Sequence, residues 1–344
     1  MPRAWVLHVD LDEFLAAVEV LRHPELAGKP VVVGGRGDPT ERGVVSTASY
    51  EAREFGVRSG MPLRTALKRC PEAVFLPVDA PTYEAASTIV MDTLRSFDAV
   101  VEVLGWDEAF LGVETDDPQA LAQEIRAAVL DATRLHCSVG IGDNKLQAKI
   151  ATDFGKPKGT YAITSETWFA EMGDRPTDAL WGIGRKTAKK LEALGITTVT
   201  ELALADPAEL AARLGPTMGP WYRRLGRGVD SSPVDATPYI ARGHGREVTF
   251  QHDLTDRGEI ETEVRRLAER VTEDIRQEGR PAIRVGIKVR YKPFITTSRS
   301  LTLEQPTDDA ELIAAAALEL FGRLESPRAV RLIGVRAEMT QPNE

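Results

Sequence analysis

The sequence predicts an α+β protein built from several domains. Three observations lead to this prediction: a length of 344 residues, end regions in which short apolar strands alternate with helices, and a middle region with a purely helical pattern. A chain of this length is expected to form two or more domains with ordinary cores. The hydrophobic fraction of 42% and the charged fraction of 28% are typical of soluble globular protein.

The first region alternates strands and helices around a mixed sheet. A strand is expected over 5–9, followed by a helix from about Asp12. The segment VVEVLGWDEAFLGV predicts two short strands joined by a tight turn near Gly105 and Trp106. The other expected elements are strands over 30–33, 44–47 and 137–141, and helical segments around YEAREFG and over 80–97, 117–135 and 144–154.

The pattern changes near Thr164 and is purely helical to about Asp235, with WGIGRKTAKKLEALGI at its centre. A stretch rich in Pro, Gly and Ser, SSPVDATPYIARGHG, then predicts a linker. The last hundred residues return to strands and helices: a strand at EVTF, a helix over 257–278, strands over 283–291 and 297–303, a helix over 308–324 and a strand over 329–337.

Several classes of protein are disfavoured by composition. The N-terminal apolar run meets Asp10 and Asp12 at once, which favours a buried strand over a signal peptide. No uninterrupted apolar run of the length that a membrane span needs is present. Cys70 and Cys137 lie far apart without metal-ligand spacing, so we expect free thiols in a reducing cytoplasm.

The net charge of −9 argues by itself against nucleic acid as a ligand, but the charge is unevenly distributed. The range 279–303 contains no acidic residue and six basic ones: Arg280, Arg284, Lys288, Arg290, Lys292 and Arg299.

Three carboxylates are candidates for metal binding. Asp10 ends an apolar strand, and Asp107 and Glu108 lie at the turn of the predicted hairpin. Two-metal phosphoryl transfer needs several carboxylates that converge on the ions. Adjacent strand residues face opposite sides, so Asp107 and Glu108 can share a site only if the backbone bends, as Gly105 permits. Spacing leaves the alternative open that all three are turn, cap or hairpin-tip residues.

Five ordered segments decide between these interpretations. Together they resemble the Y-family DNA polymerases, in the DinB or DNA polymerase IV branch, over essentially the whole chain. The segments are HVDLDEFLAAVE, VVSTASYEAREFGVRSGMP, WDEAFL, SVGIGDNKLQAKIATDFGKPKG and WGIGRKTAKKL.

The resemblance implies a right-hand polymerase with a ferredoxin-like palm, small fingers, a helical thumb containing a helix–hairpin–helix, and a tethered α/β little finger. The expected ranges are 1–13 and 79–163 for the palm, 14–78 for the fingers, 164–235 for the thumb, 236–245 for the linker and 246–341 for the little finger. It also implies template-directed, primer-dependent, low-fidelity translesion synthesis. No segment resembles a proofreading exonuclease.

By the same resemblance, Asp10, Asp107 and Glu108 are catalytic and hold two Mg²⁺ ions, which Mn²⁺ can replace. The main-chain carbonyl of Leu11 would also contact a metal, and Asp12 would serve structure as a helix N-cap. Two alternatives are a non-catalytic DNA-binding relative and a nucleotidyl cyclase. Neither is favoured, because no metal or triphosphate residue is missing and a cyclase has no use for the thumb motif or a cationic terminal sheet.

The triphosphate is expected to meet a hydroxyl, a phenol and a guanidinium. Thr47, Tyr50 and Arg53 are spaced i, i+3 and i+6, which places them on roughly one face if that segment is helical. Lys156 would add a point charge. The resemblance implies that all four residues bind the triphosphate.

The start of the first helix is expected to contact both phosphate and sugar. The main-chain amides of Phe14 and Leu15 would favour phosphate. Leu15 occupies the position where the family normally has Phe or Tyr, a flat ring that collides with a 2′-hydroxyl. We therefore hypothesise that this enzyme accepts ribonucleotides; the alternative is that Phe14 or a backbone shift restores the block. Gly105 and Trp106 also depart from the family's usual Ser and Ile.

DNA is expected to bind at two places. In WGIGRKT, Gly182 and Gly184 would let the backbone approach a phosphate, and Lys186 follows them. Near the C-terminus, cationic and apolar residues alternate with a period of two, which predicts a strand with one apolar face and one cationic face. The cationic side carries Arg284, Lys288, Arg290 and Lys292, with Arg299 and Arg331 as further candidates for the same surface.

The expected partners are primer–template DNA, dNTPs and rNTPs. Relatives often end in a Gln-containing hydrophobic peptide that binds the sliding clamp. The ending MTQPNE does not resemble it, so clamp dependence stays open. We expect a monomer that associates with the nucleoid in the cytoplasm and has no membrane partner.

Overall fold

The computed structural model describes residues 3–324 and 326–342. The chain forms two compact units: the first contains residues up to Pro39 and Gly43–Pro238, and the second contains Thr40–Arg42 and the residues from Tyr239 onward. The predicted palm range begins at residue 1, so its first two residues lie outside the described residues, as do the last two of the ending MTQPNE. Within the described part of the chain, no helix combines the length and the apolar character needed to cross a membrane.

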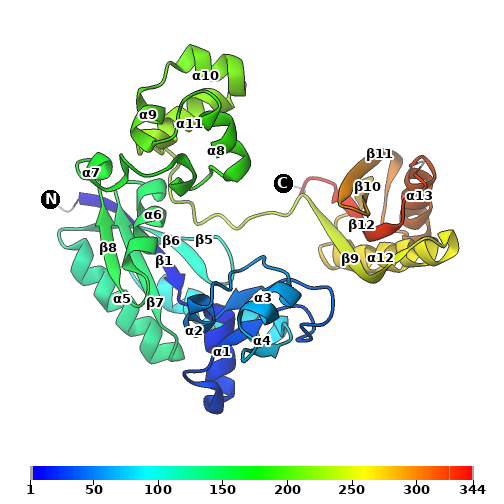
Figure 1. Ribbon diagram of the computed structural model, residues 1–344, viewed down its shortest axis with the longest axis horizontal. Helices are drawn as coiled ribbons and strands as arrows, with labels where there is room; N and C mark the ends of the chain where they lie inside the picture. The colour runs from blue at the N-terminus through cyan, green and yellow to red at the C-terminus, as the bar shows by residue number, and fades with distance from the viewer. Residues whose placement is uncertain (1–2, 325, 343–344) are drawn as a thin grey trace. The chain divides into compact units, whose positions relative to one another are not determined.

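The first unit is built on a five-stranded sheet with the order β5-β6-β1-β7-β8 (Figure 1). The central strand β1 pairs antiparallel with both β6 and β7, while β8 is parallel to β7. The bounds are β1 (Arg3–Leu11), β5 (Val100–Val103), β6 (Glu108–Thr115), β7 (Cys137–Gly142) and β8 (Thr160–Ile163).

The two faces of this sheet have different partners. Leu7, Val9 and Leu11 of β1 point into a buried cluster shared with helices α4 (Ala80–Arg95) and α5 (Pro118–Thr133). Strand residues alternate between faces, so His8 and Asp10 point to the opposite side. There they meet helix α6 (Lys145–Gly155) and its C-cap, Lys156.

Helix α6 packs so closely on β7 that no side chain fits between the backbone of the helix and the backbone of the strand. A Cβ atom at Gly140 would come within 2.0 Å of the Ala148 carbonyl oxygen, and one at Gly142 within 2.5 Å of the Ala148 nitrogen. Both strand positions therefore require glycine, and this contact sets the height of α6 above the sheet.

The segment 14–76 adds a small three-stranded sheet, β3-β2-β4, with its own buried cluster around Val32, Val45 and Leu63. Helix α1, however, packs into the buried cluster of the five-stranded sheet through Phe14 and Leu15. The elements are α1 (Phe14–Arg22), η1 (Pro24–Leu26), β2 (Val31–Val33), β3 (Thr47–Ala48), α2 (Tyr50–Glu54), α3 (Leu63–Arg69) and β4 (Val74–Leu76).

The helical pattern predicted for 164–235 is confirmed as far as Gly226, where the last helix of this range ends; residues 229–242 form no helix or strand, so the irregular stretch begins before the predicted linker at 236. The range contains α7 (Trp168–Met172), η2 (Thr177–Ala179), α8 (Arg185–Glu192), α9 (Val199–Leu204), α10 (Pro207–Leu214) and α11 (Met218–Gly226). The side-chain amides of Asn144, the N-cap of α6, and of Gln147 in α6 both donate to the Gly228 carbonyl, at 2.9 and 3.0 Å.

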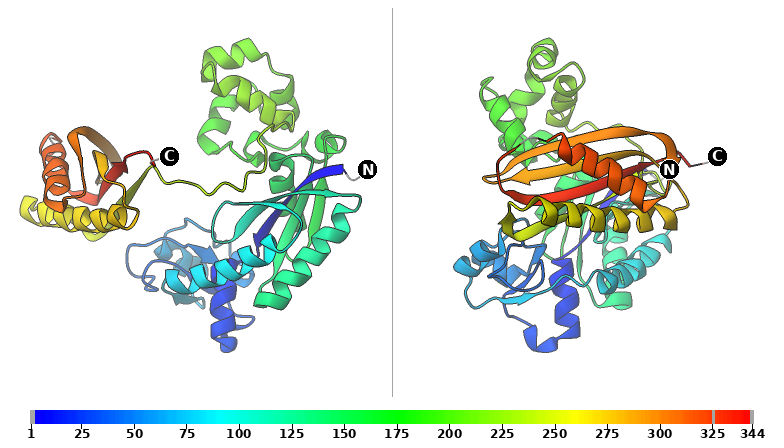
Figure 2. Two further views of the ribbon diagram at one scale, coloured as in Figure 1. Left: turned by 180° about the vertical axis from the view of Figure 1, so that it is seen from behind. Right: turned by 90° about the vertical axis from the view of Figure 1, so that its right-hand side faces the viewer.

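The second unit is a four-stranded antiparallel sheet, β11-β10-β12-β9, with both of its helices on one side (Figure 2). Its elements are β9 (Gly243–Leu254), α12 (Arg257–Gln277), β10 (Ala282–Tyr291), β11 (Ile295–Thr307), α13 (Ala310–Gly322) and β12 (Val330–Met339). Strand β9 starts inside the range predicted to be linker, because Gly243–Thr249 pair with β12.

The glycine requirement at the α6–β7 contact can be tested by replacing Gly140 with alanine. We expect Gly140→Ala to lower the free energy of unfolding by about 3 kcal/mol or more, because the methyl group would overlap helix backbone. Thermal unfolding of the full chain measures this.

Gly322→Ala is the matched control. Its Cβ would meet only the end of the Arg257 side chain, at 3.7 Å, and alanine favours a helix by roughly 0.5–1 kcal/mol over glycine. Equal stability of Gly140→Ala and the wild type would show that α6 does not depend on this close approach.

Candidate active site

Asp10 and Glu108 face each other across two paired strands. Asp10 of β1 lies opposite Glu108 of β6, and the Leu11 nitrogen donates to the Asp107 carbonyl at 2.8 Å. His8, two residues before Asp10, shares its face of β1. His8, Asp10 and Glu108 each offer one ligand atom, and these atoms lie within 4.8 Å of one another. The antiparallel register thus creates a group that can hold a cation.

Asp107 joins this region from a loop. It precedes β6 and belongs to the connection 104–107 between β5 and β6, so strand alternation does not force its side chain away from that of Glu108. The two adjacent carboxylates interact electrostatically. Trp106, which the sequence predicts near the turn between the two strands, lies in that connection, and the centre of its ring is 6.4 Å from that of Tyr83.

The carboxyl groups of the site differ in their proton affinity. Burial raises the pKa of Asp10 and of Asp107, and the charge of Glu108 adds to the rise at Asp107. The hydrogen bond to His8 and the ion pair with Lys149 lower the pKa of Glu108 to about 2. Burial lowers the pKa of His8, which keeps the imidazole neutral near pH 7. A divalent cation would relieve the charge that burial disfavours on the two aspartates.

Lys156 already lies in this site. Its ammonium group is 2.9 Å from Asp10 Oδ1, and the charge of Asp10 raises the pKa of Lys156 despite the opposing effect of burial. Lys156 therefore remains charged.

Asp12 is structural, but the prediction that it caps a helix is wrong. The N-cap of α1 is Glu13, with a left-handed φ of 45° and no side-chain cap. Asp12 is buried and accepts hydrogen bonds from the Tyr50 hydroxyl at 2.8 Å, the Ser138 hydroxyl and the Lys158 nitrogen. Its carboxylate links α2 to β7 and to the segment before β8, because three donors from these places converge on it.

The expected helix face of Thr47, Tyr50 and Arg53 is only partly formed. Thr47 lies in strand β3, because Ser49 caps α2 and the helix begins at Tyr50. Arg53 stacks 4.8 Å over the Tyr50 ring and donates to the Ala48 carbonyl. Burial and the hydrogen bond to Asp12 raise the pKa of Tyr50, which keeps its hydroxyl protonated.

Phe14 and Leu15 open helix α1 as predicted. Their side chains are buried, with exposed fractions of 2% and 8%, and Phe14 packs edge-on against Tyr83 at 6.4 Å. As first-turn residues, their backbone N–H groups have no carbonyl partner one turn earlier in the helix.

In the second unit, the alternation along β10 is confirmed. Val285, Ile287 and Val289 are buried under the helices, and the residues between them occupy the open face. The prediction that this face carries only positive charge is wrong. The pairing of the strands places Glu247 of β9 and Glu338 of β12 on the same face. Glu247 forms an ion pair with Lys288 at 2.7 Å, and Glu338 forms one with Arg284 at 3.2 Å.

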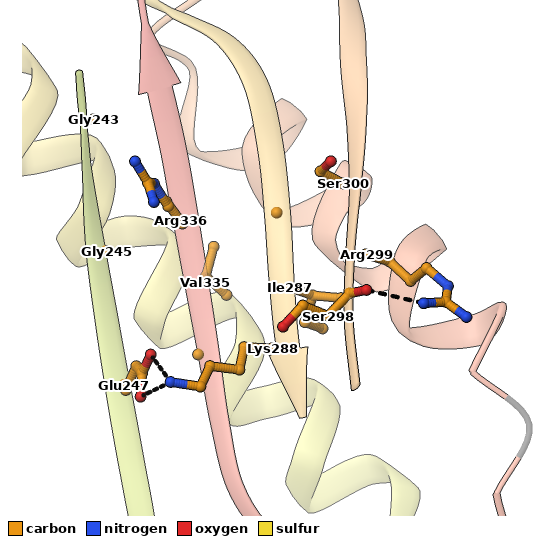
Figure 3. A pocket seen from close by; sticks show the side chains of 12 residues that line it. Gly243, Gly245, Glu247, Ile287, Lys288, Ser298, Arg299, Ser300, Val335 and Arg336 are labelled. Atoms are coloured by element: carbon orange, nitrogen blue, oxygen red, sulfur yellow. Dashed lines mark hydrogen bonds and ion pairs between the residues drawn. The ribbon is translucent and has the colours of Figure 1, made fainter. Parts of the chain in front are cut away.

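Arg299 lies at the margin of that face, but its side chain is directed away from the row of Lys288 (Figure 3). It lies opposite the buried Ile287 in the register, and Figure 3 shows its side chain extending away from Lys288. Lys292 follows the end of β10. Arg331 lies at a register shift in β12 and stacks 4.6 Å over the Phe294 ring, so it too is displaced from the row of Lys288.

The turn before α8 agrees with its prediction in part. Gly182 has a φ of 97°, and a Cβ there would come within 2.8 Å of the Trp221 ring. Gly184 is the N-cap of α8 and has open space where a side chain would be. Lys186 is exposed in the first turn of that helix.

Sequence reasoning missed several residues beside these sites. His8 could have been found from its i−2 spacing to Asp10, and Lys149 from the spacing of 145, 149 and 156 along one helix face. The open face of the second sheet also forms a trough of about 1140 Å³, which only the pairing of four strands reveals (Figure 3). Its lining includes Gly245, Gly286, Gly334, Ser298, Ser300 and Arg336.

Comparison with known families identifies similar proteins. Residues 9–153 match the impB/mucB/samB family, and residues 241–344 match the C-terminal domain of the same family. The chain is 50% identical to DNA polymerase IV 2 of Mycobacterium tuberculosis, over 98% of this chain and 100% of that protein. It is 41% identical to DNA polymerase IV of Methanoculleus marisnigri, over 98% of this chain and 94% of the relative.

Solved structures agree with these matches. A Y-family DNA polymerase chimera of Dbh and Dpo4 superposes with a TM-score of 0.86 at 28% identity, covering 97% of this chain and 98% of the chimera. An insertion ternary complex of Dbh DNA polymerase gives a TM-score of 0.67 at 27% identity, covering 98% of this chain and 100% of that one.

The buried charge of Asp107 is expected to destabilise the metal-free protein. In the presence of EDTA near pH 7, Asp107→Asn should raise stability by about 1 kcal/mol, or about 2–4 °C in melting temperature, because the amide removes a charge that burial disfavours. The gain should shrink as the pH falls through the raised pKa, since the native carboxyl group then takes up a proton.

Thermal unfolding followed by circular dichroism measures this, with Asp131→Asn on the exposed side of α5 as a control expected to change nothing. A lower melting temperature for Asp107→Asn would mean that the carboxylate stabilises the fold.

Proposed function

Because this chain belongs to the Y family of DNA polymerases, in the DNA polymerase IV branch, we propose that Asp10, Asp107 and Glu108 form its catalytic metal site. The chain is a DNA-directed DNA polymerase of the translesion type. The observation that carries the proposal is the register of β1 and β6, which puts Asp10 opposite Glu108 at the end of the sheet.

The residues present suit two Mg²⁺ ions, for which Mn²⁺ can substitute. Carboxylate and carbonyl oxygens are the donors that Mg²⁺ and Mn²⁺ prefer, and Leu11 supplies a main-chain carbonyl next to Asp10. When bound, such ions supply activation of the attacking hydroxyl and stabilisation of the leaving phosphates. The protein holds the ligands in place through the β1–β6 pairing and the bonds to Glu108.

The triphosphate is assigned to groups around α1 and α2. The amides of Phe14 and Leu15 at the helix N-terminus, the guanidinium of Arg53, and Thr47 and Tyr50 supply donors for phosphate oxygens. Lys156 binds Asp10 in the free protein and supplies a positive charge for an incoming phosphate. These side chains bind and orient the nucleotide against the carboxylates.

Leu15 leaves the sugar position open. Leucine has no flat ring to place beside a bound sugar, and its side chain is almost completely buried in the main core cluster. Phe14, the other residue that could exclude a 2′-hydroxyl, packs its ring against Tyr83. An apolar wall rejects an added hydroxyl poorly unless it clashes with it. We therefore assign ribonucleotide acceptance to this position.

Primer–template DNA is assigned to the turn before α8 and to the open face of the second sheet. Gly182, Gly184 and Lys186 offer backbone and charge to a phosphate. On the sheet, glycines at 245, 286 and 334 keep the floor of the trough at backbone level. Arg284, Lys288, Arg290 and Lys292 supply cations near the trough, and we assign Arg299 and Arg331 weaker roles at its margin.

Extension of a primed DNA template in Mg²⁺ or Mn²⁺ tests the sugar assignment. Leu15→Phe should lower rNTP incorporation relative to dNTP incorporation by about two orders of magnitude, because a planar ring would collide with the 2′-hydroxyl. Single-nucleotide kcat/KM values with each substrate measure the change.

Leu15→Met, which is apolar and flexible but has no ring, is the control and should keep rNTP use. If the wild type already discriminates as strongly as Leu15→Phe, the sugar is selected elsewhere.

A pair of arginines with differently directed side chains tests the DNA surface. Arg290→Ala should weaken binding to primer–template DNA and lower the slope of log K against log salt by about 1, as expected for one lost phosphate contact. Arg299→Ala, on the facing strand but directed away from the row of Lys288, should leave the slope nearly unchanged. Fluorescence anisotropy at several salt concentrations measures both, and equal losses would argue against the open face as the DNA surface.

A further inference from the structure

One face of helix α6 carries a lysine for each of three acidic side chains on the palm sheet. Lys145 pairs with Glu102 of β5, Lys149 with Glu108 of β6, and Lys156, the C-cap, with Asp10 of β1. The spacing of four and seven residues keeps the lysines on one side of the helix. Of these pairs, Lys149–Glu108 joins a proposed metal ligand to a residue that has no assigned role.

The side chain of Lys149 is held between Glu108 and His8 on one side and the ring of Trp181 on the other. Its ammonium group donates to Glu108 Oε2, lies 3.2 Å from His8 Nε2, and sits 5.6 Å from the centre of the Trp181 ring. Trp181 itself packs on Phe110 at 6.0 Å. The side chain of Lys149 is only 19% exposed, so these contacts leave it little freedom.

The contacts to Glu108 fall on a single oxygen. Lys149 and His8 both reach Oε2, and Oε1 makes no hydrogen bond or ion pair with any residue in 3–324 or 326–342. A carboxylate held by one oxygen keeps the other free for an ion.

We propose that Lys149 is a positioning residue that fixes the Glu108 carboxylate by Oε2 and so prepares Oε1 to bind the catalytic metal. This inference rests on the proposed role of Glu108 as a metal ligand. A charged donor on a partly buried carboxylate fixes its rotamer, and outer partners of this kind change metal affinity by roughly 10–100-fold when they are removed.

A competing interpretation is that Lys149 occupies the place of the ion and must leave when the metal binds. The contact with Trp181 argues against it, because the aromatic face stabilises the ammonium group in its present position. The two interpretations predict opposite effects of removing the charge.

Mn²⁺ binding to the full chain, without DNA or nucleotide, separates them. Free Mn²⁺ is measured by electron paramagnetic resonance, and Glu108→Gln defines the binding that depends on Glu108. Lys149→Met should bind Mn²⁺ about 10–100-fold more weakly at that site. Lys149→Arg, which keeps a charged donor, should retain most of the affinity. Lys149→Gln serves as a second loss variant if Lys149→Met does not fold.

Lys145→Met is the matched control, since it breaks a buried ion pair on the same helix face with a carboxylate outside the metal group. It should leave Mn²⁺ affinity unchanged. Unchanged or tighter binding by Lys149→Met and Lys149→Gln would overturn the positioning role, with tighter binding identifying a competitor. Loss in Lys145→Met equal to that in Lys149→Met would also overturn it, because helix packing would then explain the effect. Undiminished Mn²⁺ binding by Glu108→Gln would instead remove the premise that Glu108 is a ligand.

Discussion

The close contact between helix α6 and strand β7 governs the arrangement of the palm. Gly140 and Gly142 have no side chains to hold the helix away, so the backbone of Ala148 lies directly on the strand. This height is what allows Lys149, Thr152 and Lys156 to reach the side chains of the neighbouring strands β1 and β6. A helix one side chain further out would leave Asp10 and Glu108 without their cations.

The electrostatics of the site follow from that geometry. Burial raises the pKa of Asp10 and Asp107, which means that the fold holds charged groups where it would be more stable with neutral ones. Of the three carboxyl groups, only Glu108 has its pKa lowered overall, through His8 and Lys149, whereas the ion pair of Asp10 with Lys156 offsets the effect of burial only in part. A polymerase gains from this imbalance, because buried carboxylates with incompletely compensated charge attract divalent cations. The two buried aspartates that we propose as metal ligands thus make the metal-free fold less stable.

In the second sheet, the alternation of side chains along each strand separates an apolar face from a polar one. The inner face of this sheet is an apolar layer under α12 and α13, while its outer face has a glycine-lined floor and charged walls. Glu247 and Glu338 lie among the cations of that face and hold Lys288 and Arg284 in place. Such pairs are worth little at an exposed surface, so an incoming phosphate can exchange with the carboxylate at low cost.

The sequence by itself determined the elements with strong local signals: the strands that carry Asp10 and Glu108, the helical middle region, and the alternation along β10. The family resemblance supplied the polymerase assignment, which spacing alone left open. Tertiary structure decided whatever depends on partners distant in sequence. Asp12 binds Tyr50, Ser138 and Lys158 rather than capping a helix, and the acidic residues on the open face of the second sheet come from β9 and β12. Local pattern fixes which side of its own strand a residue faces, but only register and helix packing decide which residue it meets there.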